Sequence, residues 1–219
     1  MSGEGLAIRE LLKYQEIQSI DVVDIDPAIT NLSKENELIS RLNERALENS
    51  KVNIIHQDAF TFLKEGDSHF DVIIIDLPDP SNESLVRLYS DAFYKLCLKR
   101  LDRDGVLVTL ATSPHLSTKA FWCINETLRY AGFNYTYPYS VCVPFFGNWR
   151  FIVAKQSPEF TNSLRSDIDM RFLENENLEH LFYFAKDIRA HDIDINKLDK
   201  PILLDYYLDH WKSLQGEKR

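Results

Sequence analysis

Residues 71–80, DVIIIDLPDP, join an apolar strand to two carboxylates. The uninterrupted apolar run at 72–75 predicts a buried strand. Asp76 and Asp79 follow at its end, and prolines on both sides of Asp79 restrict the backbone and predict a fixed loop. Two carboxylates held close together repel each other unless a cation neutralises them. The stretch therefore predicts a cation site at the end of a buried strand.

Strand and helix patterns alternate on both sides of this stretch. Near-continuous apolar strands separated by helices are typical of a parallel sheet covered by helices on both faces. Two aromatic-rich strands at the end suggest an antiparallel addition. We expect an α/β domain over residues 1–156 and a small helical or irregular extension over 157–219. The predicted strands are 19–26, 51–58, 70–76, 105–112, 133–143 and 150–155, and the predicted helices are 5–14, 59–66, 83–101, 117–131 and, in the extension, 178–188.

Composition limits the class of protein. With 44% hydrophobic and 27% charged residues, the 219-residue chain can form a packed core. Its net charge of -9 argues against nucleic acid, which needs clustered Lys and Arg, and suits a cationic small molecule. Three widely spaced cysteines, Cys97, Cys123 and Cys142, predict reduced thiols in a cytoplasmic protein. We find no apolar run of about 18 residues and no signal peptide before the first element, and therefore expect a soluble chain.

Acidic residues recur where the predicted strands end. Glu4 lies in the opening SGEG loop, while Asp24, Asp58 and Asp76 each end a strand. In an open α/β sheet, ligands bind outside the carboxyl ends of the strands, so we expect these acids to contribute to one site. Asp24 follows the glycine loop at about the spacing of 20 residues at which an acid binds ribose hydroxyls. Together the loop, Asp24 and Asp58 predict a nucleoside site.

Several of these acids also fit a structural role. Asp24 and Asp26 precede a helix that begins near Pro27, and Asp58 precedes another, so each can cap a helix instead of binding a ligand. For the pair after the strand, a divalent metal would find no nearby His or Cys and few ligands. An organic ammonium group supplies positive charge and hydrogen-bond donors together. We therefore predict an amine there and no metal.

The segments GEGLAIREL, VDIDP, QDAFTFL and DVIIIDLPDP have the order and spacing found in the polyamine aminopropyltransferases, the spermidine synthase family. The resemblance covers residues 3–155. Within the family, the sequence is similar to a bacterial spermidine synthase-like branch, in which a membrane-embedded segment often precedes the catalytic domain. It implies a Rossmann-like fold of the class I methyltransferase type. It also implies transfer of the aminopropyl group of decarboxylated S-adenosylmethionine, a co-substrate, to putrescine or a related amine. Methylthioadenosine is the second product, no prosthetic group is needed, and a cytoplasmic homodimer is expected.

The resemblance assigns roles to individual residues. Asp76 occupies the position of the catalytic carboxylate, and Asp79 that of its partner in holding the polyamine. Because an amine with a pKa of about 10 must lose a proton before it attacks, a nearby carboxylate suits the chemistry. The remaining assigned positions are Glu4 toward the amine end of the substrates, Asp24 at the ribose, and Asp58 and Ala59 at the adenine.

The chain also departs from the family pattern. It starts in the glycine loop without the usual preceding strand and N-terminal β-domain, so we expect a fragment or a misassigned start, with unpaired backbone on two strands. Phe145 and Trp149 stand near the place of a substrate-contacting tyrosine, and either an aliphatic-chain wall or core packing fits them. For Tyr89 and Tyr94 packing is favoured over substrate contact.

Two other functions stay open at this point. A methyltransferase using intact S-adenosylmethionine shares the fold, but Glu4 in its loop argues against the methionyl carboxylate. A non-catalytic module that keeps the nucleoside or polyamine site is the other alternative.

Overall fold

The structure is a computed structural model that describes residues 2–143, 147–158, 163–170 and 172–214. The chain divides into two compact units, residues 1–66 with 165–170 and residues 67–164 with 171–219. This division falls between Gly66 and Asp67. The domain boundary predicted after residue 156 stays a prediction. Within the described ranges, the helices are too short or too polar to cross a membrane.

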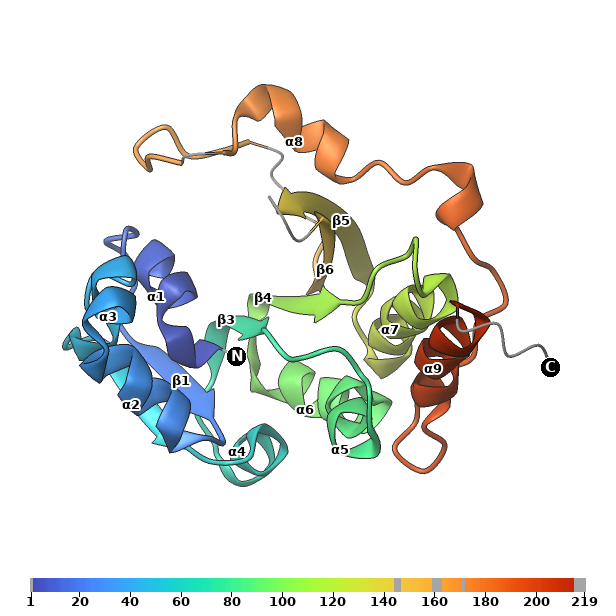
Figure 1. Cartoon of the computed structure of the whole chain (residues 1–219), viewed down its shortest axis with the longest axis horizontal. Helices are drawn as coiled ribbons and strands as arrows, with labels where there is room; N and C mark the ends of the chain where they lie inside the picture. Colours follow the sequence, from blue (N-terminus) through green and yellow to red (C-terminus); the bar gives the residue numbers. More distant parts are fainter. Residues whose placement is uncertain (1, 144–146, 159–162, 171, 215–219) are drawn as a thin grey trace. The chain divides into compact units, whose positions relative to one another are not determined.

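The first unit is built on two parallel strands. Ile20 of one strand lies opposite Val52 of the other, and the ladder continues to Asp24 and His56. Its core contains Ile8, Val22, Ala46 and Leu47. In chain order, the elements are η1 (Ser2–Glu4), α1 (Leu6–Leu11), β1 (Ile20–Asp24), α2 (Pro27–Glu35), α3 (Glu37–Leu42), η2 (Ala46–Glu48), β2 (Val52–His56) and α4 (Ala59–Glu65), coloured blue to cyan in Figure 1.

The second unit contains a four-stranded sheet in the order β3-β4-β6-β5. β3 runs parallel to β4, and β6 is antiparallel to both β4 and β5, so the predicted antiparallel addition is confirmed. The helices α7 and α9 pack side by side (Figure 1). The elements are β3 (Phe70–Ile75), α5 (Glu83–Val86), η3 (Arg87–Tyr89), α6 (Asp91–Arg100), β4 (Leu101–Ala111), α7 (Thr118–Ala131), β5 (Tyr135–Val143), β6 (Gly147–Lys155), α8 (Asn175–Leu181), η4 (Lys186–Ile188) and α9 (Ile202–Leu214).

Large side chains fill the core of the second unit. Tyr94, Phe121 and Leu107 are fully buried, and they come from α6, α7 and β4. The thiols of Cys97 and Cys123 are free and buried in the same unit, and burial raises the pKa of Cys123 to about 12. These side chains pack the helices against the sheet that contains β3.

Two helical predictions are wrong in detail. The helix expected over residues 83–101 is interrupted at Ser90, whose backbone is extended (φ -83°, ψ 159°) and whose hydroxyl accepts a hydrogen bond from the Phe93 amide. A new helix therefore starts after Ser90, and Leu101 already belongs to β4. In the C-terminal extension, α8 ends at Leu181, and the sequence reading missed α9 altogether.

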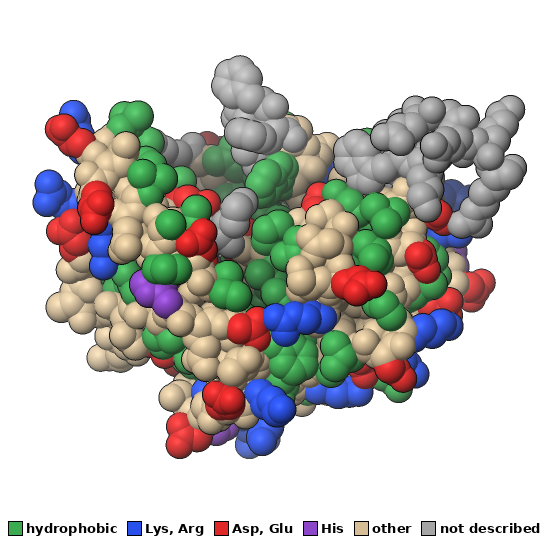
Figure 2. Space-filling model, turned by 60° about the horizontal axis from the view of Figure 1, so that its bottom comes forward, with side chains coloured by type: hydrophobic (Ala, Val, Ile, Leu, Met, Phe, Trp, Pro, Cys, Tyr) green, Lys and Arg blue, Asp and Glu red, His purple; other side chains and the backbone are tan. Residues whose placement is uncertain are grey.

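The predicted strands form two sheets rather than one. Within the described residues, β1 has a ladder only with β2, and β3 only with β4. On β3, the side chains of Val72 and Ile74 are 52% and 43% exposed. Figure 2 shows one face of the molecule, on which hydrophobic side chains lie among charged ones. One edge of β3 is unpaired in this part of the chain.

Candidate functional site

Asp76 and Asp79 follow the carboxyl end of β3, as predicted. Asp76 comes directly after Ile75 and is half-buried. The loop then turns tightly, because the Ser81 amide donates to the Asp79 carbonyl oxygen at 2.7 Å. Asp79 is exposed as a whole residue, yet partial burial of its carboxyl group raises its pKa, and a hydrogen bond from Tyr207 opposes the rise. The structure therefore places both carboxylates on one constrained loop at a strand end.

The buried side chain of Tyr89 forms a hydrogen bond to the backbone of this loop. Its side chain is 1% exposed, and its hydroxyl lies 3.0 Å from the Pro78 carbonyl oxygen, to which it donates. Burial raises the pKa of Tyr89, and the nearby charges of Asp79 and Asp76 raise it further. The hydroxyl consequently stays protonated and remains a donor. The packing role expected for Tyr89 and Tyr94 is confirmed, and Tyr89 in addition fixes the loop.

Tyr207 contacts the candidate site residue Asp79, and the sequence analysis did not single it out. It lies on α9, and its hydroxyl donates to Oδ2 of Asp79 across 3.3 Å. The pair Leu203 and Tyr207, both buried and four residues apart, carries a helical signal that could have revealed α9. No local pattern links Tyr207 to a loop 128 residues earlier in the chain.

In the first unit, the opening loop approaches Asp24 closely. A Cβ placed on Gly3 would lie 2.9 Å from Oδ2 of Asp24 and 2.8 Å from Cγ2 of Ile29, so the backbone here needs glycine. The other Asp24 oxygen, Oδ1, accepts from the Asp26 amide at 3.0 Å. Glu4, which is half-buried, is tied down through its carbonyl oxygen by the Asn43 side chain at 2.9 Å. The structure thus brings the glycine loop and Asp24 together.

Two acids adopt the capping role that the sequence left open. Asp26 accepts from the Ala28 amide at 2.8 Å and begins α2. Oδ1 of Asp58 accepts from the Thr61 amide at 2.9 Å and from the Thr61 hydroxyl at 3.0 Å, and so caps α4. Ala59 is the first residue of that helix and is half-buried. Capping fixes the Asp58 carboxylate at the carboxyl end of β2, where a ligand would meet it.

The predicted site residues are distributed over both compact units. Glu4, Asp24, Asp58 and Ala59 belong to the first unit, and Asp76 and Asp79 to the second. Each group is fixed by contacts inside its own unit. Of the two aromatic candidates, Trp149 is exposed on β6, and Phe145 lies outside the described residues.

Gly3→Ala is expected to destabilise the first unit by about 1 kcal/mol, because an added methyl overlaps Ile29 and the Asp24 carboxylate. Thermal unfolding measures the loss. Gly66→Ala is the matched control, since Gly66 is exposed and has φ -74°, which alanine adopts without strain. Equal melting temperatures for the two variants would contradict the close approach of the loop to Asp24.

A solved structure with the same fold is that of a spermidine synthase in complex with the transition state analogue AdoDATO. It superposes with a TM-score of 0.69 at 18% sequence identity, covering 85% of this chain and 64% of that one. The fold is therefore the Rossmann-like, methyltransferase-type α/β fold of the spermidine synthases, with its sheet divided in this chain as described above.

Sequence comparison places the chain in a family. The spermine/spermidine synthase domain model matches residues 2–166. A polyamine aminopropyltransferase of Leptospira interrogans is 42% identical over 213 residues, which are 97% of this chain and 42% of that protein. Polyamine aminopropyltransferase 2 of Ralstonia nicotianae is 36% identical over the same shares of the two chains. The chain belongs to the spermine/spermidine synthase family and spans about two fifths of the length of these relatives.

Proposed function

We propose that the chain carries the adenosyl and amine sites of an aminopropyltransferase. The reaction moves the aminopropyl group of decarboxylated S-adenosylmethionine to putrescine or a related amine and releases methylthioadenosine. The observation that carries this proposal is the pair of carboxylates, Asp76 and Asp79, on a constrained loop at the end of β3. Family membership and the names of the relatives support it.

In the proposed reaction, Asp76 accepts a proton from the attacking ammonium group. The freed nitrogen lone pair then forms a bond to the aminopropyl carbon next to the sulfonium, and the bond from that carbon to sulfur breaks. Sulfur keeps the electron pair, so methylthioadenosine leaves as a neutral thioether. Asp79 holds the amine in place, and the negative potential of both carboxylates favours a cationic substrate. Positioning and negative potential would supply most of the rate enhancement.

The first unit would bind the adenosyl part. Asp24 is suited to the ribose hydroxyls because the glycine loop lies against it, and Asp58 with Ala59 is suited to the adenine. Glu4 lies in that same loop and would face the amine end of the substrates. Its carboxylate would favour the decarboxylated co-substrate over intact S-adenosylmethionine, whose own carboxylate it would repel.

Asp24→Ala is expected to abolish the thermal stabilisation of the chain by methylthioadenosine. A ligand at 100 times its dissociation constant stabilises the folded state by about 2.7 kcal/mol, and the variant loses its ribose contact. The measurement is a thermal-shift titration with methylthioadenosine, decarboxylated S-adenosylmethionine and intact S-adenosylmethionine. Asp21→Ala is the control, because Asp21 is exposed at the start of the same strand and should leave the shift unchanged.

The same titration distinguishes the proposed function from its rivals. Preference for intact S-adenosylmethionine would indicate a methyltransferase instead. No shift with any of the three compounds would contradict an adenosyl site in this chain. The homodimer and the cytoplasmic location inferred from the family resemblance stay predictions, and sedimentation of the purified chain tests the first of them.

A further inference from the structure

We propose that the C-terminal extension completes the amine site, with Tyr207 as a positioning residue for Asp79. The proposal rests on the proposed function, because it concerns how the amine-holding carboxylate is oriented. The match to the family domain ends at residue 166, so Tyr207 on α9 lies outside it.

The contact itself joins a buried phenol to a carboxylate. Tyr207 is 8% exposed, and its hydroxyl lies 3.3 Å from Oδ2 of Asp79. A tyrosine hydroxyl is a neutral donor, so it directs the carboxylate without cancelling its charge. A Lys or Arg in the same place would compensate the negative charge that an ammonium substrate needs. Tyr207 therefore suits a site that must remain anionic.

A second tyrosine holds the same loop from a different element. Tyr89 donates to the carbonyl oxygen of Pro78, next to Asp79 in the chain, whereas Tyr207 donates to the side chain of Asp79. Backbone and carboxylate are thus fixed separately by two buried hydroxyl groups. Loss of the Tyr207 hydroxyl alone is expected to release the carboxylate and leave the loop backbone in place.

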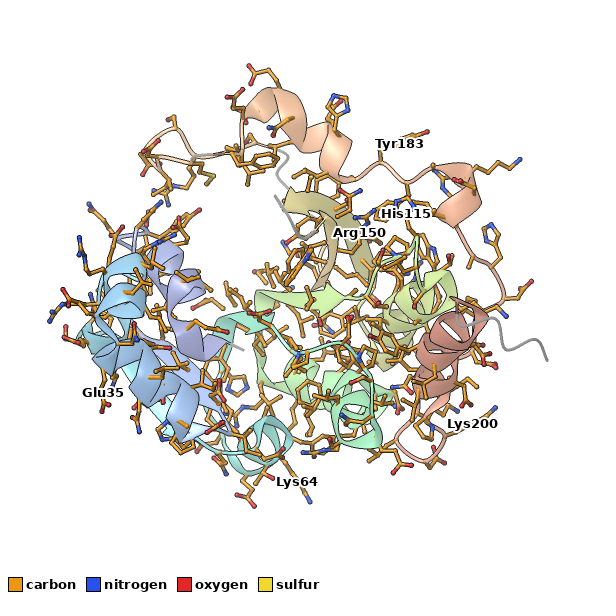
Figure 3. All side chains as sticks on the ribbon, viewed as in Figure 1. Glu35, Lys64, His115, Arg150, Tyr183 and Lys200 are labelled. Atoms are coloured by element: carbon orange, nitrogen blue, oxygen red, sulfur yellow. The ribbon has the colours of Figure 1, made fainter. Side chains whose placement is uncertain are left out.

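Asn196 anchors α9 to the segment that carries Tyr89. This asparagine is 0% exposed, and its Nδ2 donates to the carbonyl oxygens of Val86 at 3.1 Å and Tyr89 at 3.0 Å. Its Oδ1 accepts from the Leu203 amide at 3.3 Å, in the first turn of α9. Lys200, labelled in Figure 3, marks the turn between Asn196 and the helix. One buried side chain therefore links both tyrosine-bearing elements.

The test compares Tyr207→Phe with Tyr206→Phe in the full 219-residue chain. Tyr206 is its neighbour on α9 and is half-buried, and the Lys119 ammonium lies over its ring. For Tyr207→Phe we expect KM for putrescine to rise roughly three- to tenfold with kcat almost unchanged, as suits the loss of one hydrogen bond that orients a charged group. Calorimetric titration with putrescine, in the presence of methylthioadenosine, should show the same rise in Kd. Tyr206→Phe should change neither constant.

The outcomes separate this proposal from the proposed function. A raised Kd for putrescine in Tyr207→Phe alone supports the positioning role, even if the chain does not turn over and the catalytic proposal fails. Equal Kd values for wild type and Tyr207→Phe overturn it. A wild-type chain that binds no putrescine also overturns it, since Asp79 then holds no amine. A melting temperature of Tyr207→Phe equal to that of the wild type shows that the change is not one of folding.

Discussion

Asp76→Asn is expected to lower the turnover of putrescine and decarboxylated S-adenosylmethionine by about 10²- to 10⁴-fold. Asparagine has nearly the same shape as aspartate, but it cannot accept a proton from the attacking nitrogen. Since Asp76 directly follows the buried end of β3, the substitution should leave the strand in place. The rate is measured as release of methylthioadenosine, with the amine at saturating concentration.

A matched carboxylate on the same strand provides the control. Asp71 is exposed near the start of β3, away from the carboxyl end, and Asp71→Asn should retain wild-type turnover. Thermal stabilisation by methylthioadenosine should persist in Asp76→Asn, because the adenosyl contacts are assigned to the other compact unit. Equal rates for Asp76→Asn and Asp71→Asn would exclude Asp76 as the proton acceptor.

Asn196→Ala is expected to reduce the free energy of unfolding by about 2–4 kcal/mol. The variant removes three hydrogen bonds and leaves the carbonyl oxygens of Val86 and Tyr89 and the Leu203 amide buried without this partner. Unpaired buried polar groups keep the full cost of their lost hydration, which makes this loss larger than a surface change. Urea unfolding followed by tryptophan fluorescence measures it.

Asn134→Ala serves as the comparison for this measurement. Asn134 is exposed and its side chain makes one hydrogen bond, from Nδ2 to the Gln156 carbonyl oxygen at 3.3 Å. Its substitution should change stability by less than about 0.5 kcal/mol. If Asn196→Ala unfolds at the same urea concentration as Asn134→Ala, then Asn196 does not anchor α9.

Local signals in the sequence were sufficient to predict where the strands lie and which carboxylates follow them. The apolar run before Asp76 and the Pro27 and Gly132 helix boundaries depend on neighbouring residues alone, so a pattern can predict them. The interruption at Ser90 was missed because its flanking residues keep a helical pattern while its own backbone is extended. Residues that act through long-range contacts were inaccessible to such reasoning.

The capping aspartates show a different limit. The position of Asp58 was predicted correctly, yet a carboxylate before a helix suits both a cap and a ligand, and the structure reveals that it caps α4. Tyr207 and Asn196 carry no distinctive motif, and their roles arise from partners far away in sequence. Only a three-dimensional arrangement identifies them.

Among the described residues, β3 pairs on one side only, with β4, and its other edge bears on how the chain behaves at high concentration. An apolar strand with exposed Val72 and Ile74 can add a strand from another molecule, which is the first step of β-aggregation. Charged residues at the ends of such a run act as gatekeepers that oppose this addition. Asp71 and Asp76 stand at both ends of the run. We therefore expect the carboxylate proposed for catalysis to oppose β-aggregation as well.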